Sequence, residues 1–245
     1  MPIIVVSILI QLCLVIHIIK TGKNTTWIWV IVILPLVGSL AYIILEILPD
    51  ITNSRSGRQA GKRLQSVINP NKDLNEAAKD FSTSNTVENS MRLANECFGK
   101  GLFDEAKALY QKSLRGVHTD DPELMHGLAK CEFELGGFLA AKNILDDLID
   151  KNPDFKNQGA HLLYARSLER IGDDISAEHE YQTLYNYASG PEASYYYAKY
   201  LQSKGQHELA REIFSEIVQK AKNSGRHYND LYGEVIKKSK NEISS

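Results

Sequence analysis

The stretch KGLFDEAKALYQKSL at residues 100–114 decides the fold, because three later stretches align with it without a gap. They are LGGFLAAKNILDDLI at 135–149, IGDDISAEHEYQTLY at 171–185 and KGQHELAREIFSEIV at 204–218. Glycine fills one column of this alignment and alanine a second, and a third column, seven residues before the glycine, is again alanine. All three columns share the spacings 35, 36 and 33, which predicts a repeat architecture.

The residue types in these columns fit a helix–turn–helix unit. Glycine at the end of a first helix takes the left-handed conformation of a turn without the steric cost of a Cβ. Alanine fits where two paired helices cross most closely, and a large apolar residue one turn after the second alanine lies on the same face. The columns are Ala94, Ala129, Ala165 and Ala198; Gly101, Gly136, Gly172 and Gly205; Ala106, Ala141, Ala177 and Ala210; and Tyr110, Leu145, Tyr181 and Phe214.

This pattern resembles the tetratricopeptide repeat family over about residues 86–225. That family has a small residue at position 8, glycine at 15, alanine at 20, an aromatic residue at 24 and proline near 32. The same pattern is read here across the units, with Leu145 at the aromatic position of the second and no proline after the fourth. Position 4, often Trp in the family, is Ser90, Met125, His161 and Ser194, which departs from the pattern. The resemblance implies a right-handed superhelix of antiparallel helix pairs, with a concave face that binds peptides or protein segments.

Two uncharged runs precede the repeats, from Pro2 to Ile19 and from Thr25 to Leu45. Each approaches the roughly 20 apolar residues that cross a bilayer core of about 30 Å. With the short turn KTGKNTT between them, we expect a two-helix transmembrane hairpin over residues 1–49. More basic residues follow the second run than lie in the turn, which favours a cytoplasmic location for the repeats.

The second run, TWIWVIVILPLVGSLAYIILE, resembles part of the two-helix N-terminal module of bacterial cardiolipin synthases in the phospholipase D superfamily, over about residues 5–48. This resemblance implies a bacterial inner (plasma) membrane protein. The superfamily's catalytic H-x-K-x4-D motif does not occur, because none of the seven histidines is followed two places later by lysine. No catalytic residue of that superfamily transfers to this chain.

The sequence also has no motif for a metal site or a disulfide. The three cysteines have no metal or disulfide spacing, and the sequences HEYQT at His179 and HELAR at His207 lack the second histidine of a zinc site. We therefore predict no enzymatic activity, no metal and no cofactor. The net charge of −2, without a strongly basic domain, also predicts that nucleic acid is not a partner.

The sequence thus predicts an all-α chain, a two-helix transmembrane hairpin followed by a tetratricopeptide-repeat α-solenoid. We expect the hairpin at 1–49, a basic juxtamembrane linker with a short helix opening at Pro70 over 50–85, and four repeats over 86–225. A C-terminal capping helix is expected at 226–245, because a solenoid must cover its last apolar face. Its apolar stripe is predicted to contain Tyr228, Leu231, Tyr232 and Val235.

The family resemblance also implies a binding groove, since positions 2, 5, 9 and 12 of each first helix face it. Position 9 is a cation in three successive repeats, and aromatic residues flank it, which suits an extended acidic segment. The alternative is that these cations are ordinary solvated side chains at exposed positions. The candidate groove residues are Asn95, His126, Lys130, Arg166, Tyr195 and Lys199.

The function predicted from these features is a membrane-anchored cytoplasmic scaffold or adaptor that binds a protein or peptide in the repeats. An alternative is a non-catalytic regulatory subunit of a membrane lipid or envelope-biosynthesis enzyme, in contact with that enzyme through the hairpin. A third is formation of a homo-oligomer through the solenoid.

Overall fold

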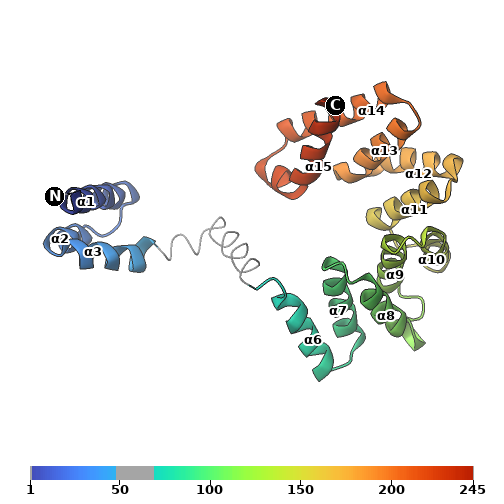
Figure 1. Ribbon diagram of the computed structural model, residues 1–245, viewed down its shortest axis with the longest axis horizontal. Helices are drawn as coiled ribbons and strands as arrows, with labels where there is room; N and C mark the ends of the chain where they lie inside the picture. The colour runs from blue at the N-terminus through green and yellow to red at the C-terminus, as the bar shows by residue number, and fades with distance from the viewer. Residues whose placement is uncertain (1, 48–68, 245) are drawn as a thin grey trace. The chain divides into compact units, whose positions relative to one another are not determined.

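A computed structural model describes the backbone of residues 2–47 and 69–244, and every regular element in these ranges is a helix (Figure 1). The chain divides into two units, residues 1–72 and 73–245. Most of the predicted linker, residues 50–68, lies outside the described residues. The all-α prediction is confirmed for the part of the chain that is described.

The second unit is a series of antiparallel helix pairs. The first helices of the pairs line the inner curve of the unit and the second helices lie outside them (Figure 1). The first helices are α7 (Val87–Gly99), α9 (Pro122–Glu134), α11 (Gln158–Ile171) and α13 (Pro191–Ser203). The second helices are α8 (Phe103–Ser113), α10 (Phe138–Lys151), α12 (Asp174–Tyr187) and α14 (His207–Asn223), and a short 3-10 helix, η2 (Gly116–His118), precedes α9.

The aligned columns of the sequence explain this arrangement. The glycines at 101, 136, 172 and 205 all have positive φ, between 76° and 84°, so each ends a first helix in the left-handed region. The eight alanines of the two columns are buried, and so are the four large residues at 110, 145, 181 and 214. The repeat prediction is confirmed.

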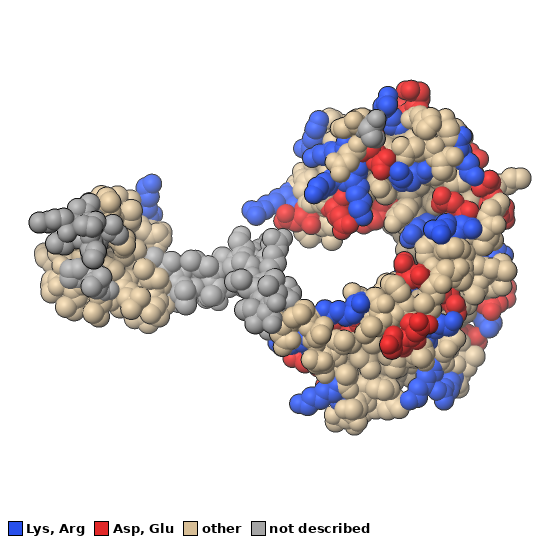
Figure 2. Space-filling view, viewed as in Figure 1, with Lys and Arg blue, Asp and Glu red and all other residues tan. Residues whose placement is uncertain are grey.

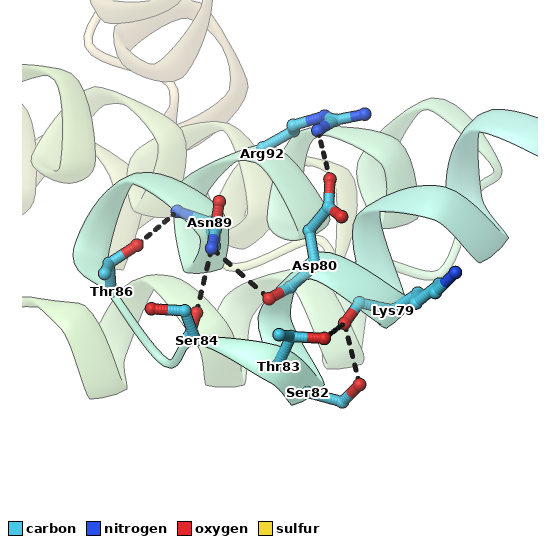
Figure 3. Close-up of polar contacts among 8 residues, drawn as sticks. All are labelled: Lys79, Asp80, Ser82, Thr83, Ser84, Thr86, Asn89 and Arg92. Atoms are coloured by element: carbon cyan, nitrogen blue, oxygen red, sulfur yellow. Dashed lines mark hydrogen bonds and ion pairs between the residues drawn. The ribbon is translucent and has the colours of Figure 1, made fainter.

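A further helix, α6 (Lys72–Thr83), precedes the first repeat and is joined to it by polar contacts (Figure 3). The Asn89 side-chain amide of α7 donates to the carbonyl oxygens of Asp80 and Ser84, at 3.3 and 2.9 Å. The Asp80 carboxylate pairs with the Arg92 guanidinium at 2.6 Å, and the Thr86 hydroxyl caps α7 by accepting from the Asn89 backbone N–H. These bonds fix the connection between α6 and α7.

The last helix, α15 (Arg226–Ser244), packs against α14 and α13 at the C-terminal end of the repeats. Ile236 is buried there, and Tyr228, Tyr232 and Ile243 pack against the same core. Leu231, which the sequence placed on the apolar stripe, is instead 62% exposed. The predicted stripe is wrong at this position, because the buried face of α15 is turned toward Tyr232 and Ile236.

The first unit contains α1 (Pro2–Thr21), α2 (Thr26–Ile33), α3 (Pro35–Tyr42) and a π-helical turn, η1 (Ile43–Ile47). The predicted second helix is therefore interrupted. A residue before proline is sterically excluded from the α region, and Leu34 has φ −124° and ψ 77°. Pro35 then begins a new helix, where its missing N–H costs little.

The second apolar run folds back on itself after this interruption. The Trp27 indole N–H donates to the Glu46 carboxylate at 3.2 Å, and the Lys23 ammonium pairs with the same carboxylate at 2.9 Å. A straight helix over this distance in sequence would separate its ends by about 30 Å. None of the helices in the described parts of the chain combines the length and apolar character needed to cross a membrane. The predicted transmembrane hairpin is not supported.

We expect Gly127→Ala to destabilise the second unit. A Cβ at Gly127, inside α9, would lie 2.4 Å from the ring of Tyr110, which is buried and whose hydroxyl donates to Asn95 at 2.7 Å. Overpacking typically costs about 1–3 kcal/mol, more than the roughly 0.5–1 kcal/mol that alanine gains over glycine in a helix. Urea denaturation of the full chain, followed by circular dichroism, measures the change.

Gly233→Ala is the matched control, because a Cβ at this helical position of α15 meets no atom within 4 Å. This variant is expected to be more stable than the original chain by about 0.5–1 kcal/mol. Equal stabilisation by both substitutions would show that the contact between Gly127 and Tyr110 is not tight.

Candidate functional site

Position 9 of the repeats forms a row along the inner helices. Asn95 lies on α7, Lys130 on α9, Arg166 on α11 and Lys199 on α13, each one repeat further along the unit. The four residues therefore have equivalent places on successive helices of the inner curve (Figure 1). The predicted position-9 residues lie on four successive inner helices, and the contacts of each side chain differ.

The two central cations of the row stack on aromatic rings. The Lys130 ammonium lies 4.4 Å from the ring centre of Phe98, on the preceding inner helix. The Arg166 guanidinium lies between Phe133 of the preceding inner helix, at 4.5 Å, and Tyr196 of the following one, at 4.3 Å. We call these five residues the cation–aromatic ladder. Such contacts contribute about 0.5–2 kcal/mol each, and they fix the positions of both charges.

The two ends of the row have partners within the chain. Asn95 accepts a hydrogen bond from the Tyr110 hydroxyl. The Lys199 ammonium donates to Gln202 at 2.7 Å and pairs with the Glu242 carboxylate of α15 at 3.1 Å. The row therefore presents two ring-stacked cations at its centre and one neutralised cation at its C-terminal end.

The remaining two candidates, at position 5, are enclosed by their surroundings. Burial, and to a lesser degree the neighbouring charge of Lys130, lowers the pKa of His126 to about 4, so this imidazole is neutral at pH 7. Tyr195 packs against Tyr196 and Phe214, with ring centres 5.5 and 5.7 Å apart, and burial raises its pKa. Both residues supply neutral surface beside the cations.

The charge around the ladder is mixed. Figure 2 shows Lys and Arg interspersed with Asp and Glu over the second unit. Neighbouring Glu132 pairs with Lys107 at 2.9 Å, and Glu169 accepts from the Tyr181 hydroxyl at 2.6 Å. Both carboxylates are held by partners in the chain but keep their negative charge, so the ladder cations lie in a surface of mixed charge.

Two residues that contact the cations of the row were not predicted from the sequence. Tyr196 forms one wall of the Arg166 site, and its place in the run of tyrosines at 195–197 was the available signal. Glu242 lies 43 residues after Lys199, so no local pattern connects them. Phe98 and Phe133, at position 12, were already expected to flank the cations.

The structure offers no cluster for metal or thiol chemistry in its described ranges. No group of three or more His, Cys, Asp or Glu side chains is gathered there. Cys97 and Cys131 are buried, and burial raises the pKa of both thiols, that of Cys131 to about 11. A thiol with a raised pKa is a poor nucleophile at neutral pH.

Comparisons with known proteins agree with this geometry. Family models described as tetratricopeptide repeat match residues 98–166 and 192–224. The second unit is therefore a tetratricopeptide-repeat solenoid. The expected likeness of the N-terminal segment to cardiolipin synthases is not shown by these comparisons.

Two solved structures illustrate the likeness of fold. One is TTC0263, a thermophilic tetratricopeptide-repeat protein of Thermus thermophilus, with 16% identity, 73% of this chain and 96% of that chain covered, and a TM-score of 0.56. The other is MamA from residue 41 onward, of Desulfovibrio magneticus RS-1, with 12% identity, 68% and 94% coverage and a TM-score of 0.54. A search of curated proteins found no match.

The lowered pKa of His126 predicts a pH-dependent stability. Because the folded-state pKa of about 4 lies below the ordinary value of 6.5, the unfolded chain binds this proton more readily between these pH values. Stability is present above pH 6.5 and is lost as the pH falls toward 4, by about 2 kcal/mol between pH 7 and pH 5 for this residue. His126→Gln should remove that part of the loss, as measured by urea denaturation at both pH values.

His179→Gln is the control, since His179 is exposed on α12. It should leave the difference in unfolding free energy between pH 7 and pH 5 unchanged. If His126→Gln and His179→Gln give the same pH dependence as the original chain, the imidazole of His126 is not enclosed as described.

Proposed function

We propose that the chain is a non-catalytic scaffold that binds an extended acidic segment of a partner protein along the inner helices of its repeats. The observation that carries this proposal is the cation–aromatic ladder. Stacking of Lys130 and Arg166 on fixed rings removes much of the side-chain freedom that a flexible cation would lose on binding. Carboxylates on a ligand would meet charges already in place.

The chemistry of the ladder suits this ligand for two reasons. Arg166 can present its N–H groups at the edge of the guanidinium while its faces remain stacked between Phe133 and Tyr196. The spacing by one repeat places the cations along a line, which favours an extended chain over a compact small molecule. Charge then steers the encounter, and ring edges supply apolar contact.

Lys130→Glu/Arg166→Glu is expected to lower the affinity for a fluorescein-labelled peptide of alternating Glu and Phe by about tenfold or more, since two attractive charges become repulsive. Fluorescence anisotropy with the full chain measures this affinity. The same peptide with Gln in place of Glu should bind weakly to both proteins. Affinity of the Glu peptide should fall as salt is raised, as expected for partly exposed charges.

Arg211→Glu/Lys222→Glu is the matched control, because it makes the same change in charge on exposed positions of the outer helix α14. It should have little effect on binding. Equal losses in the two double variants would mean that only the total charge of the protein matters, and the proposed groove would be rejected. Sedimentation velocity on the same samples separates peptide binding from self-association of the solenoid.

We also propose that the first unit makes contact with a lipid surface, which the sequence leads us to expect is the bacterial inner membrane, with the repeats on its cytoplasmic side. The supporting observation is the number of large apolar side chains that this small unit exposes, among them Trp29 at 69% and Ile33 at 70%. Several of its polar side chains pair internally, as in the contact of His17 with the Tyr42 hydroxyl at 3.0 Å. Figure 2 shows an exterior of this unit with few charged residues among those described.

Trp29→Asp/Ile33→Asp should lower the binding of the full chain to vesicles of phosphatidylethanolamine and phosphatidylglycerol by about tenfold or more, because each large apolar side chain contributes roughly 1.5–3 kcal/mol when buried. Flotation in a density gradient measures bound protein. Val117→Asp/Ile175→Asp changes two apolar residues of the repeats that are still more exposed, and this variant should float as the original chain does. Unchanged flotation of the first variant would show that Trp29 and Ile33 do not make the lipid contact, whereas failure of the original chain to float would favour an apolar partner protein, such as a membrane enzyme.

A further inference from the structure

A second surface of the repeats, away from the ladder, contains a cavity of about 450 Å³. It lies between the outer helices α10 and α12, with α11 and the connection before it completing the wall. Its apolar lining includes Leu145, Leu148, Ile149 and Phe155. Tyr164 of α11 faces this cavity, whereas Arg166 of the ladder, two residues later, points to the other side of the helix. The cavity and the ladder are therefore separate sites.

The local sequence explains why the cavity is apolar here. The equivalent groove of the next repeat, between α12 and α14, also contains a cavity, of about 360 Å³. Its lining is more polar, because the Tyr185 hydroxyl donates to the Glu216 carboxylate at 2.5 Å there. The residue aligned with Tyr185 is Ile149, which cannot form such a hydrogen bond and is 54% exposed. The connection from Asn152 to Asn157 also brings Phe155 to the wall, whereas the next connection, 188–190, is shorter.

Most of the polar groups around this cavity already have hydrogen-bond partners within the chain. The two ring nitrogens of His161 contact the Tyr187 hydroxyl at 2.8 Å and the Glu180 carboxylate at 2.5 Å. Asn157 caps α11 by accepting from the backbone N–H groups of Gly159 and Ala160. Lys156 differs, because it makes no ion pair with any residue in the described parts of the chain. The lining thus offers an apolar floor and one unpaired cation.

We propose that this cavity binds a segment of a partner protein that inserts one large apolar side chain and places a carboxylate next to it, at Lys156. A cavity of several hundred Å³ with few polar groups is the common form of a binding site for an apolar group. Leu, Ile, Met or Phe fits the apolar floor, and a neighbouring Asp or Glu complements the charge of Lys156. Glu180 also lines the cavity and is in contact with His161, so the carboxylate of the ligand is expected at Lys156 and not beside Glu180.

The outer surface of a repeat pair thereby becomes a second docking surface, independent of the inner one. Because the two sites use different side chains of α11, a partner on the ladder leaves the cavity accessible. The proposal for the ladder can be wrong while the cavity still binds its ligand, and the proposal for the cavity can be wrong while the ladder still binds an acidic segment.

Selection of peptides from a random display library on the full chain tests the site. Peptides that depend on the cavity should be enriched in a large apolar residue next to Asp or Glu. Their affinity should fall about tenfold with Ile149→Asp, through loss of an apolar contact, and about threefold with Lys156→Glu. It should be unchanged by Lys130→Glu/Arg166→Glu.

The matched controls are Ile175→Asp and Lys222→Glu, which make the same changes at exposed positions elsewhere in the repeats and should have no effect. If none of the enriched peptides loses affinity with Ile149→Asp, the proposal is overturned. The same result is expected if a second copy of the chain, or another segment of the same chain, fills the cavity, and the proposal is wrong in that case too. If enriched peptides respond only to the ladder substitutions, the inner groove is the sole peptide site and the cavity proposal is likewise wrong.

Discussion

The structure depends on the close approach of two helices at a pair of alanines. Ala94 and Ala106, and their equivalents in each later repeat, are fully or almost fully buried, which lets the backbones of a pair come close together. A side chain longer than alanine by even one methylene would push the helices apart here, because protein interiors tolerate little added volume. The large residue one turn later then fills the remaining space, as Tyr110 does against Gly127. The antiparallel pairing of the helices in each repeat depends on this crossing.

The sequence was sufficient for the repeats because their determinants are local and recur. Gly101 and its equivalents require positive φ, and the alanines are required at fixed offsets from them, so three columns identify the pair and its period. The ladder was predictable in part, since Lys130 and Phe98 follow from positions 9 and 12 of adjacent repeats. The pairing of Lys199 with Glu242 was not, because it depends on how far α15 extends along α13. The cavity also has no sequence signature, as it arises from the length of one connection and the replacement of a tyrosine by Ile149.

The first unit shows the opposite case, because its apolar composition was taken to predict one continuous helix long enough to cross a membrane. The run from Thr25 to Leu45 has the apolar character of a membrane helix, but Pro35 lies in its middle and excludes Leu34 from the α region. The signal was present in the sequence, and the fold-back is fixed by Glu46, which meets both Trp27 and Lys23. An apolar run therefore predicts contact with other apolar groups. Whether it forms one continuous helix depends on its proline.

The pairing of Lys199 with Glu242 has a consequence for the inner surface. The Glu242 carboxylate of the chain's own last helix pairs with Lys199, the third cation of the row, where the proposed ligand would place a carboxylate. An exposed ion pair of this kind is worth no more than about 1 kcal/mol, so it can exchange with an external carboxylate at little net cost. Among the described residues, Lys130 and Arg166 form no ion pair, and aromatic rings hold them in place. Binding energy for an acidic segment should therefore come from the centre of the row, while the end near α15 sets how far along the repeats the segment extends.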